Sequence, residues 1–528
     1  MTRNGTDHER AAGAASLRSR LAALRPALRL ARSPLALSVL SAILLILSAP
    51  GIGSPFFAWI ALAPLTAALW FSASRRAGFL YGWLAGFLFY CGLLYWLFPT
   101  MRAGGLGPGL AAGGVALLAA LLALEFGLFG LLGRSFRRAG VSAFPFALAA
   151  LWTLIEWAKV LLTDGGLWFP WFLLAYTQWP NERLIQIVSL TGPWGLSFAL
   201  AFSGTLIGSA FFREVTPARK VRRLGWVLGI AGFLWLFGNG ELKKADALPP
   251  GRTIKAAALQ PCVDFYRKWD ESYADEIKRR LGGLAAEARA AGAGLVIWPE
   301  NALPGWIDDE EIYSWLTSVS SGTYSLVGSV SKGDGRYVSA FLIGPDGRQE
   351  SFYNKRKLVP FGEYIPLTGI FGGALRTLGA LGEFSPGTRF QGLMEYEGLK
   401  ISAGICYESV FPYLSRGDAL KGADLLVNMT NDGWYLDTAG PHQHFAVNVF
   451  RAAENRRPML RAANNGISAF IDPWGRVTHR LDLDERGVLA AEVEAPELPR
   501  SFYAHNGDWF GWLCLTICAA FLLAVLFL

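Results

Sequence analysis

The feature that most constrains this chain is a series of long apolar runs between about Ser33 and Asn239. Each run is about 17 to 25 residues long, the length that a helix needs to cross a bilayer core of roughly 30 Å. Another run, DWFGWLCLTICAAFLLAVLFL, follows near the end of the printed sequence. Charged residues make up 17% of the chain, against about a quarter of an average globular protein. Part of this chain is therefore predicted to lie in lipid.

The runs predict a multi-pass α-helical membrane bundle of about eight helices, at 34–50, 54–72, 78–99, 107–133, 143–163, 190–212, 224–240 and 508–528. The alternative for the two weakest segments, 143–163 and 224–240, is a buried core helix. The predicted domains are a basic tail (1–33), a seven-helix membrane bundle (34–240), a soluble domain (251–499) and a closing membrane helix (508–528).

Positive charge follows a topological pattern. Basic residues gather in the tail and in alternate loops, at Arg75, Arg76, Arg134, Arg137, Arg138, Arg213, Arg219, Lys220, Arg222 and Arg223, while Arg102 stands alone in an intervening loop. Cytoplasmic loops carry the excess of Lys and Arg. Seven helices before the soluble domain put every basic loop on the cytoplasmic side. The N-terminus is thus predicted to be cytoplasmic, and the soluble domain to face outward, into the periplasm if the membrane is a bacterial inner membrane.

The net charge of +8 is therefore mostly a signal of topology. A nucleic-acid partner would require basic residues interleaved with aromatic ones on the soluble domain, so none is expected. Among the five cysteines, Cys262 and Cys406 fall in the soluble domain. A disulfide between them is one reading in an oxidising compartment, and two separate thiols are the other. The Cys and His spacings predict no metal site, and no cofactor is expected.

Region 251–499 alternates strand and helix patterns. Strands are predicted at 253–261, 293–301, 324–330, 337–355 (a hairpin), 399–408 and 423–432, then as a pair around PMLRAANN and GISAFIDPWG; helices are predicted at 268–291, 309–319, 410–420 and 441–455. Such alternation predicts a layered α/β domain. Functional residues of such a domain gather where strands end and loops begin.

Three of these ends carry reactive groups. Glu300 follows one strand, Lys355 ends another, and Cys406 ends a third. Taken singly, a charge at a strand end is usually a solvated cap, and a strand cysteine is usually a small hydrophobe. Together they supply a base, a cation and a nucleophile, which thiol catalysis requires.

The motifs IWPEN, NKRKLVPFGEYIP, GICYES, VNMTNDGW and LRAANNGISAFIDPWG, in this order, resemble the carbon–nitrogen hydrolase (nitrilase) superfamily. The loop LVPFGEYIP and the apolar helices on both sides resemble, more narrowly, its membrane-embedded apolipoprotein N-acyltransferase family. The resemblance covers nearly the whole chain after the tail. It implies an αββα sandwich with Glu300 as general base, Lys355 as oxyanion-stabilising cation and Cys406 as nucleophile.

The resemblance also implies supporting roles for Trp269, Glu363, Pro366, Tyr407, Glu408 and Arg457. For three of them a structural role is the alternative: Glu363 as a surface carboxylate, Trp269 as part of the core and Arg457 as a helix brace. Glu408 is expected to orient the site without taking a proton from substrate. Asn428, Asn431 and Asp432 are expected to hold the turn after a strand. The chain departs from the family pattern at Val338, where Asn is expected, and at His442, where Trp is common.

The implied activity is transfer of an acyl chain from a membrane phospholipid to the N-terminal amine of the diacylglyceryl-modified cysteine of apolipoproteins. It would proceed by ping-pong through a Cys406 thioester and form the last step of bacterial lipoprotein maturation. The partners would be a phospholipid donor and a diacylated apolipoprotein, served by a monomer. The loop 367–387 has the composition of an apolar lid, and it and segment 165–180 are expected to line the lipid entrance.

Two other functions remain open at this stage. A membrane-tethered amidase or nitrilase would use the same three residues and let water take the place of the amine. A membrane scaffold would keep the fold only to bind a partner and would not need all three residues.

Overall fold

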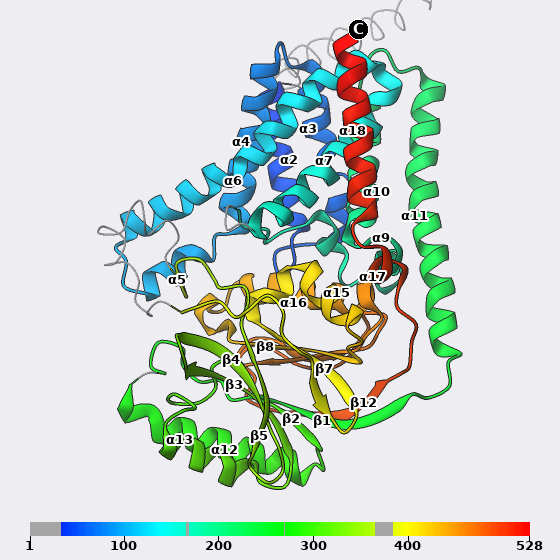
Figure 1. Cartoon of the computed structure of the whole chain (residues 1–528). Helices are drawn as coiled ribbons and strands as arrows, with labels where there is room; N and C mark the ends of the chain where they lie inside the picture. The colour runs from blue at the N-terminus through cyan, green and yellow to red at the C-terminus, as the bar shows by residue number, and fades with distance from the viewer. Residues whose placement is uncertain (1–32, 165–167, 269, 365–383, 528) are drawn as a thin grey trace, which may run out of the picture.

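The computed structural model describes residues 33–164, 168–268, 270–364 and 384–527. A unit of long helices stands on an α/β sandwich, and the C-terminal helix α18 ends at the side of the helical unit remote from the sandwich (Figure 1). The helical unit comprises α2 (Pro34–Ser48), α3 (Leu62–Phe71), α4 (Arg75–Leu93), α5 (Leu97–Ala103), α6 (Pro108–Phe136), α7 (Gly140–Asp164), α8 (Glu182–Ile185), α9 (Val188–Thr191), α10 (Pro193–Ser209), α11 (Pro217–Asp246) and α18 (Trp509–Phe527).

Each of the eight predicted apolar segments contains a helix. By length and composition, three helical stretches of the described residues can cross a bilayer, at 108–163, 217–246 and 509–527. The number rises to as many as five if two bent pairs each count as one span. One pair is α4 with α5, bent by 50°, and the other is 182–191 with α10, bent by 119°.

Small residues let two of these helices approach closely. A Cβ placed on Gly82 of α4 would lie 2.1 Å from the carbonyl oxygen of Phe126 in α6, and one on Gly130 would lie 2.0 Å from that of Gly78. Glycines spaced four apart are a common helix contact in membranes, where van der Waals packing replaces the hydrophobic effect. Substitution of Gly82 or Gly130 would therefore push α4 and α6 apart.

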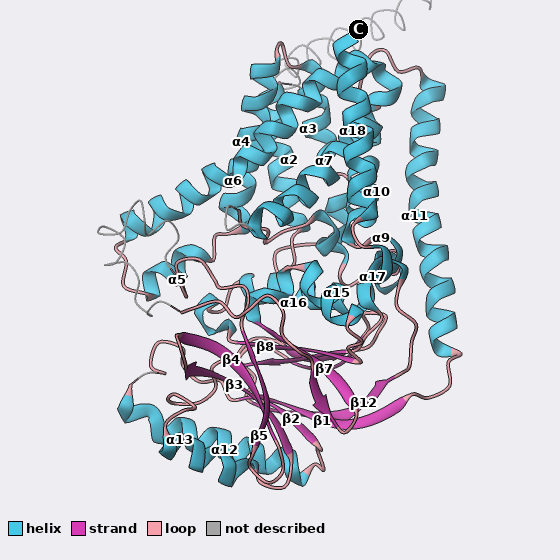
Figure 2. Ribbon diagram, viewed as in Figure 1, coloured by secondary structure: helices cyan, strands magenta, loops and turns pink. Residues whose placement is uncertain are grey.

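The sandwich contains two six-stranded sheets (Figure 2). The first has the order β12-β1-β2-β3-β4-β5 and the second β11-β10-β9-β8-β7-β6. The strands are β1 (Arg252–Gln260), β2 (Leu295–Ile297), β3 (Tyr324–Lys332), β4 (Arg336–Ile343), β5 (Gln349–Asn354), β6 (Met394–Tyr396), β7 (Leu399–Ile405), β8 (Leu425–Thr430), β9 (Met459–Ala463), β10 (Ser468–Ile471), β11 (Val477–Leu481) and β12 (Gly487–Ala495).

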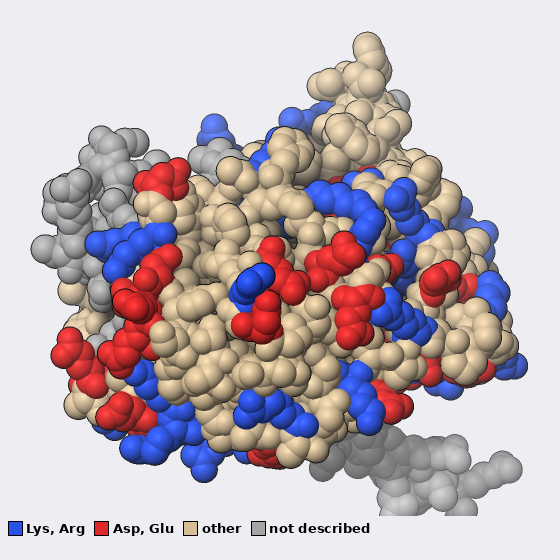
Figure 3. Space-filling model, turned by 60° about the horizontal axis from the view of Figure 1, so that its bottom comes forward, with Lys and Arg blue, Asp and Glu red and all other residues tan. Residues whose placement is uncertain are grey.

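Helices cover both outer faces of the sheet pair. The helices are α12 (Ala274–Ala290) and α13 (Glu310–Ser320) on the side away from the helical unit, and α15 (Pro412–Leu420), α16 (Gly440–Asn455) and the short α17 (Phe502–Asn506) on the side that faces it (Figure 1). The predicted α/β sandwich is thereby confirmed. The face that carries α12 and α13 displays positive and negative side chains side by side (Figure 3).

The predicted strands are found, and three further ones, β6, β11 and β12, were not predicted. β6 has only three residues, and the three central residues of β11 are exposed, so neither carries a strong apolar signal. Helix α12 begins at Ala274 and not at 268, because Asp270 caps a separate short 3₁₀ turn, Glu271–Tyr273, before it. The prediction for 268–291 therefore began too early.

Candidate active site

The predicted catalytic residues meet at the carboxyl ends of strands from both sheets. Glu300 lies just beyond β2 and Lys355 directly after β5 in the first sheet, while Cys406 directly follows β7 in the second. All three residues are buried. The two sheets thus bring together three groups that are separated by up to 106 positions in the sequence.

Lys355 is held between two carboxylates. Its Nζ lies 2.8 Å from Oε1 of Glu300 and 2.6 Å from Oε1 of Glu363, and its side chain is fully buried. Burial alone would lower the pKa of Lys355, but the two carboxylates outweigh burial and raise it well above its ordinary value. For Glu363, burial raises the pKa despite the Lys355 charge. Lys355 is therefore held as a cation, and Glu363, whose side chain is 15% exposed, is a partly buried partner of Lys355 and not a free surface carboxylate.

Glu300 also links the two sheets. Its Oε2 accepts a hydrogen bond of 3.0 Å from the backbone N–H of Asn431, which follows β8. Gly328 in β3 permits this position, because a Cβ there would lie 2.7 Å from the Cα of Glu300 and 2.2 Å from the carbonyl oxygen of Pro299. Both carboxylate oxygens of Glu300 are thus fixed, one on Lys355 and one on the opposing sheet.

Cys406 occupies a sharp turn from strand to helix. It opens the 3₁₀ helix η5 (Cys406–Val410) with φ of 50°, a left-handed conformation that is uncommon for a residue other than glycine. Its carbonyl oxygen accepts hydrogen bonds from Asn428 Nδ2 at 3.2 Å and from His444 Nε2 at 3.1 Å. These two donors fix the strained backbone, so the thiol is presented in one orientation.

Charges of opposite sign act on the Cys406 thiol. Burial and the negative charge of Glu300 raise the pKa of Cys406 well above its ordinary value, while the Lys355 charge and a hydrogen bond with Thr430 oppose the rise. The resting thiol is therefore protonated at neutral pH. It needs a base at the moment of attack, and Glu300 is the carboxylate whose charge the thiol feels most.

A buried polar network that was not predicted supports Cys406 from behind. Asp432 Oδ1 lies 2.9 Å from His444 Nδ1, and Asp432 Oδ2 lies 2.7 Å from Arg461 Nη2, with all three side chains fully buried. Burial would raise the pKa of Asp432, but Arg461 and His444 outweigh it and lower the pKa to about 2. The predicted role of Asp432 as a turn holder missed this network. The helical periodicity of 441–455, which turns His444 inward, was the one available signal.

Ligand atoms of Cys406, Asp432 and His444 lie within 4.8 Å of one another, a spacing that a metal ion could in principle use. However, the guanidinium of Arg461 already binds Asp432, and its positive charge lies where a cation would have to bind. His444 Nε2 is occupied by the Cys406 carbonyl. The donor set therefore fits a hydrogen-bond network better than a metal centre.

Glu408 folds back onto the backbone that carries the site. Its Oε2 accepts the N–H of Ile405 at 2.8 Å, and its Oε1 accepts the N–H of Arg356 at 2.7 Å and the hydroxyl of Tyr353 at 2.7 Å. These bonds tie the residue before Cys406 to the residue after Lys355. Burial raises the pKa of Glu408. These contacts are compatible with the predicted orienting role of Glu408, which stays a prediction.

Tyr407 faces the helical unit. Its ring stacks on Phe169 at 5.8 Å and on Trp171 at 6.5 Å between centroids, and meets Phe411 edge-on at 5.1 Å. Trp171 Nε1 in turn donates to Gln443 Oε1 of α16 at 2.7 Å. The residue beside the nucleophile is thus fixed by aromatic side chains that precede it in the sequence by more than 230 positions.

Arg457 lies away from the catalytic group. Its Nε donates to the carbonyl of Ala423 at 2.7 Å, near the amino end of β8, whereas the site gathers at the carboxyl ends. It therefore braces the chain between α16 and β9. Trp269, Pro366 and the part of the proposed lid up to residue 383 lie outside the described residues.

At Val338, where the family pattern has Asn, the contact with Lys355 is made by the backbone. The Val338 side chain is buried, and its carbonyl oxygen accepts the backbone N–H of Lys355 at 2.8 Å. That contact uses backbone atoms and does not depend on the side chain at 338. The alternative of a disulfide between Cys262 and Cys406 is not realised, because both cysteines are free.

Lys268 is a further buried group near Glu300 that was not predicted. Its Nζ donates to the carbonyl oxygens of Leu303, at 2.8 Å, and of Asn301, which adjoins Glu300 and has φ of 49°. Burial lowers the pKa of Lys268 to about 7. Its contacts pin the loop that carries the base.

Comparison with known proteins agrees with this geometry. Residues 255–499 match the carbon–nitrogen hydrolase family, and residues 41–206 match the apolipoprotein N-acyltransferase N-terminal domain. The chain is 36% identical to the apolipoprotein N-acyltransferase of Geobacter metallireducens, over 91% of this chain and 92% of the relative. It is 34% identical to that of Azotobacter vinelandii, over 83% and 86% respectively.

Among solved structures, an amidase from Nesterenkonia sp. aligns with a TM-score of 0.37 at 20% identity, over 50% of this chain and 96% of the amidase. The identity to the Geobacter and Azotobacter proteins extends through both the helical unit and the sandwich. This chain belongs to the apolipoprotein N-acyltransferase family.

Proposed function

We propose that this protein transfers an acyl chain from a membrane phospholipid to the N-terminal amine of a diacylglyceryl-modified cysteine of apolipoproteins. The observation that carries the proposal is the position of Lys355, which lies between Glu300 and Glu363 and whose charge acts on the Cys406 thiol. Family membership supplies the substrates of the reaction, and the site supplies groups that can perform both halves of it.

In the first half-reaction, Glu300 takes the proton of the Cys406 thiol as the sulfur attacks the ester carbonyl of the phospholipid. The carbonyl oxygen becomes an oxyanion that Lys355 stabilises together with the backbone N–H of Tyr407. The carbon–oxygen bond of the ester then breaks. The leaving alkoxide receives the proton from Glu300 and departs as lysophospholipid, and a thioester remains on Cys406.

In the second half-reaction, the amine of the apolipoprotein attacks the thioester carbonyl. The terminal ammonium must first lose one proton to become a nucleophilic amine. Glu300 then accepts a second proton from the nitrogen during the attack. The same oxyanion position is used again. The carbon–sulfur bond breaks, the new amide leaves as mature lipoprotein, and the thiolate recovers its proton. A covalent intermediate divides the reaction so that the two lipids need not occupy the site together.

The helical unit gives this chemistry access to lipid. We infer an eight-helix bundle with seven helices at 34–240 and an eighth at 508–528, a cytoplasmic N-terminal tail at 1–33, and a catalytic domain at 251–499 in the periplasm. The charge pattern of the loops supports this orientation. Aromatic contacts between the units support an active site beside the membrane surface: Trp96 of α4–α5 packs on Tyr435 at 4.8 Å, and Thr100 Oγ1 donates to the carbonyl of Trp434 at 2.8 Å.

The decisive experiment is mass spectrometry of the purified protein after incubation with a phospholipid. An adduct of one acyl chain on the Cys406 peptide is expected, and it should disappear when a diacylated lipopeptide with a free N-terminal amine is added. A lipopeptide with an acetylated N-terminus is the matched control and should leave the adduct in place.

The same experiment tests the amidase alternative, in which water is the acceptor. Loss of the adduct in buffer alone, at the rate seen with the lipopeptide, would contradict acyl transfer and favour hydrolysis. Absence of any adduct on Cys406 would contradict the thioester mechanism itself.

A further inference from the structure

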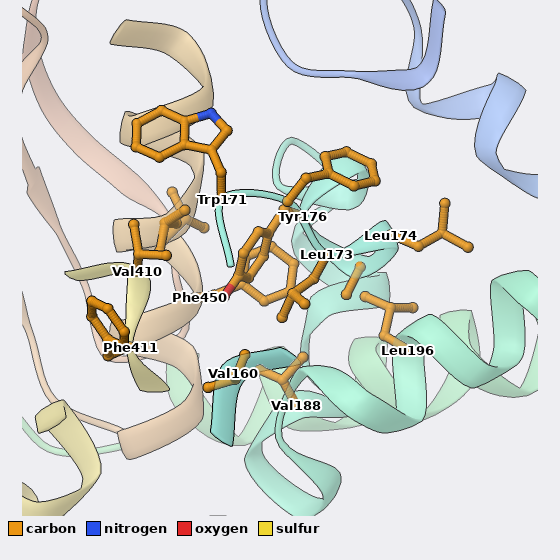
Figure 4. Packing of buried hydrophobic residues seen from close by; sticks show 14 of the residues in the cluster. Val160, Trp171, Leu173, Leu174, Tyr176, Val188, Leu196, Val410, Phe411 and Phe450 are labelled. Atoms are coloured by element: carbon orange, nitrogen blue, oxygen red, sulfur yellow. The ribbon is translucent and has the colours of Figure 1, made fainter. Parts of the chain in front are cut away.

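Two buried carboxylates in the helical unit hold both ends of the segment that packs against Tyr407, the residue after the nucleophile. This segment, residues 168–174, is called the strap below. It connects α7 to the sandwich-facing side of the helical unit, and its residues Trp171, Leu173 and Leu174 lie between the helices and the buried side chains of the sandwich (Figure 4).

The first end of the strap is bound by Glu125 of α6. Glu125 Oε2 accepts the indole N–H of Trp168 at 3.2 Å, while Oε1 accepts the hydroxyl of Tyr90 and lies 3.5 Å from Nζ of Lys159. The side chains of Glu125 and Lys159 are 7% and 5% exposed. A charged pair placed this deep among apolar helices is costly unless every group has a partner, so the contact with Trp168 completes the cluster.

The second end is bound by Glu156 of α7. Its Oε1 accepts the backbone N–H of Leu174 at 2.7 Å and the indole N–H of Trp152 at 3.0 Å. Glu156 is 2% exposed. The strap therefore has one anchor on α6 and one on α7.

Between the anchors, the strap reaches the active site. Phe169 and Trp171 stack on each other at 5.6 Å, and both stack on the ring of Tyr407, which follows Cys406. Trp171 also donates to Gln443 of α16 at 2.7 Å. The anchored residue Trp168 thus directly precedes Phe169. Phe169 in turn stacks on Tyr407, whose backbone N–H is assigned to stabilise the oxyanion.

We propose that Glu125 and Glu156 are positioning residues of the reaction, which act through the strap to fix Tyr407 beside the nucleophile. The proposal rests on the proposed function, because its effect is on the Cys406 half-reactions. A displacement of the oxyanion donor by about 1 Å can cost on the order of 100-fold in rate even when the cause is remote. The mechanism described above uses neither carboxylate.

The test uses the full-length protein in detergent micelles with phospholipid and measures the rate of acyl-adduct formation on Cys406. Glu125→Gln offers one acceptor oxygen where the carboxylate has two, so it cannot satisfy Trp168, Tyr90 and Lys159 together. Trp168→Phe keeps an aromatic six-membered ring and removes the indole N–H together with the five-membered ring. Each is expected to lower the maximal rate by roughly 10- to 100-fold with an unchanged KM for phospholipid.

The double variant separates a positioning role from general damage. Because both substitutions break the same contact, Glu125→Gln with Trp168→Phe should be no slower than the slower single variant. If the double variant instead loses rate by the product of the two single losses, the proposal is contradicted. A wild-type rate in Trp168→Phe would contradict it as well. Trp168→Phe keeps the buried charges intact, so the test stands even if Glu125→Gln fails to fold.

At Glu156, a conservative substitution can be compared with a disruptive one. The carbonyl oxygen of Glu156→Gln can still accept both N–H groups, whereas Glu156→Leu can accept neither. Retained rate in the first variant and a loss of roughly 10-fold or more in the second are expected; equal rates in both would contradict the role.

Glu214→Gln, a change at an exposed glutamate of the helical unit, is the matched control. Absence of the adduct in the wild-type protein would overturn the proposed function, while an adduct formed at wild-type rate in all variants would overturn only the strap.

Discussion

The ammonium nitrogen of Lys355 lies 2.8 Å from Oε1 of Glu300, and the two residues come from different strand ends of the same sheet. One is assigned as base and the other as oxyanion stabiliser. Their contact means that neither charge is buried alone, which removes most of the cost of placing them next to an apolar thiol. It also means that a change at either residue alters the electrostatics of the other.

Lys355→Met is expected to lower the rate of acyl-adduct formation by about 10²–10³-fold, the usual cost of one lost oxyanion donor. The change also leaves Glu300 and Glu363 buried without their shared cation. Single-turnover mass spectrometry of the Cys406 peptide measures the rate. Lys278→Met, which removes an ammonium group of α12 bound to the exposed Glu311 of α13, should leave the rate unchanged. A rate within a factor of about two of wild type in Lys355→Met would contradict the role.

Glu300→Gln should separate thiol ionisation from catalysis. Burial and the Glu300 charge raise the pKa of Cys406. Removal of the negative charge therefore lowers that pKa, and the pH profile of alkylation by iodoacetamide at Cys406 should move to lower pH. Acyl-adduct formation should nevertheless slow, because the base is lost. An alkylation profile that stays in place or moves to higher pH would show that Glu300 does not act on the thiol.

Glu363 is expected to matter through the position of Lys355. Its Oε1 binds Lys355 Nζ and its Oε2 accepts the N–H of Val359 at 2.9 Å, so it fixes the loop and the cation together. Glu363→Gln can keep one of these contacts and Glu363→Ala neither. The adduct rate should fall in the order wild type, Gln, Ala, with a loss of roughly 100-fold in the last. Equal rates in the two variants would argue against positioning.

Glu408→Gln should affect stability more than chemistry. The amide nitrogen of Gln cannot accept a hydrogen bond, so either the Ile405 N–H or the Arg356 N–H and Tyr353 hydroxyl lose their acceptor. Loss of acceptors for buried donors costs about 1–3 kcal/mol, and a lower Tm is expected in a thermal melt. Adduct formation well below the Tm should continue. Complete loss of the adduct in a folded variant would show that Glu408 takes part in proton transfer.

The Asp432 network should make the sandwich sensitive to acid. The pKa of Asp432 is lowered from 3.8 to about 2. A carboxyl whose pKa is lower in the folded state contributes stability above its unfolded value, and this contribution disappears as pH falls through the folded value. The loss is therefore expected between about pH 4 and pH 2.

Arg461→Met tests this pH window. Without the guanidinium, the folded-state pKa of Asp432 rises toward or above its unfolded value of 3.8, so less stability is lost on protonation and the fall of Tm between about pH 4 and pH 2 should be smaller than in wild type. Arg480→Met, which removes an arginine paired with Asp482 at the surface, is the matched control. Superimposable Tm profiles for Arg461→Met and wild type would contradict the assignment.

Local sequence was enough to single out Glu300, Lys355 and Cys406 as candidates. Cys406 directly follows the apolar strand β7, Glu300 lies three residues beyond the apolar strand β2, and Lys355 directly follows the mostly polar strand β5. A strand end is a position that local sequence can reveal without knowledge of the partners. Two of the missed strands gave little local signal, because β6 has only three residues and the three central residues of β11 are exposed. The apolar runs likewise located the helices, because length and hydropathy are local properties.

Tertiary contacts decided what the sequence could not show. Asp432, His444 and Arg461 come from a turn, a helix and a strand, and nothing in their local patterns says that they meet. Glu125, Lys159 and Trp168 are polar groups in apolar surroundings whose partners are 34 and 43 positions away. Hydrophobic periodicity reports how deeply a residue is buried, but not which buried group it meets.

The sequence by itself determined the two kinds of surroundings, lipid-length helices and an α/β sandwich, and the three reactive groups at strand ends. Only the tertiary structure decided that Lys355 bridges Glu300 and Glu363, that Glu408 accepts backbone N–H groups, and that a strap from the helices packs on Tyr407. The physical reason is the range of the interactions: the length and periodicity of apolar runs are properties of neighbours along the chain, whereas ion pairs and ring contacts depend on the distance between atoms that folding brings together.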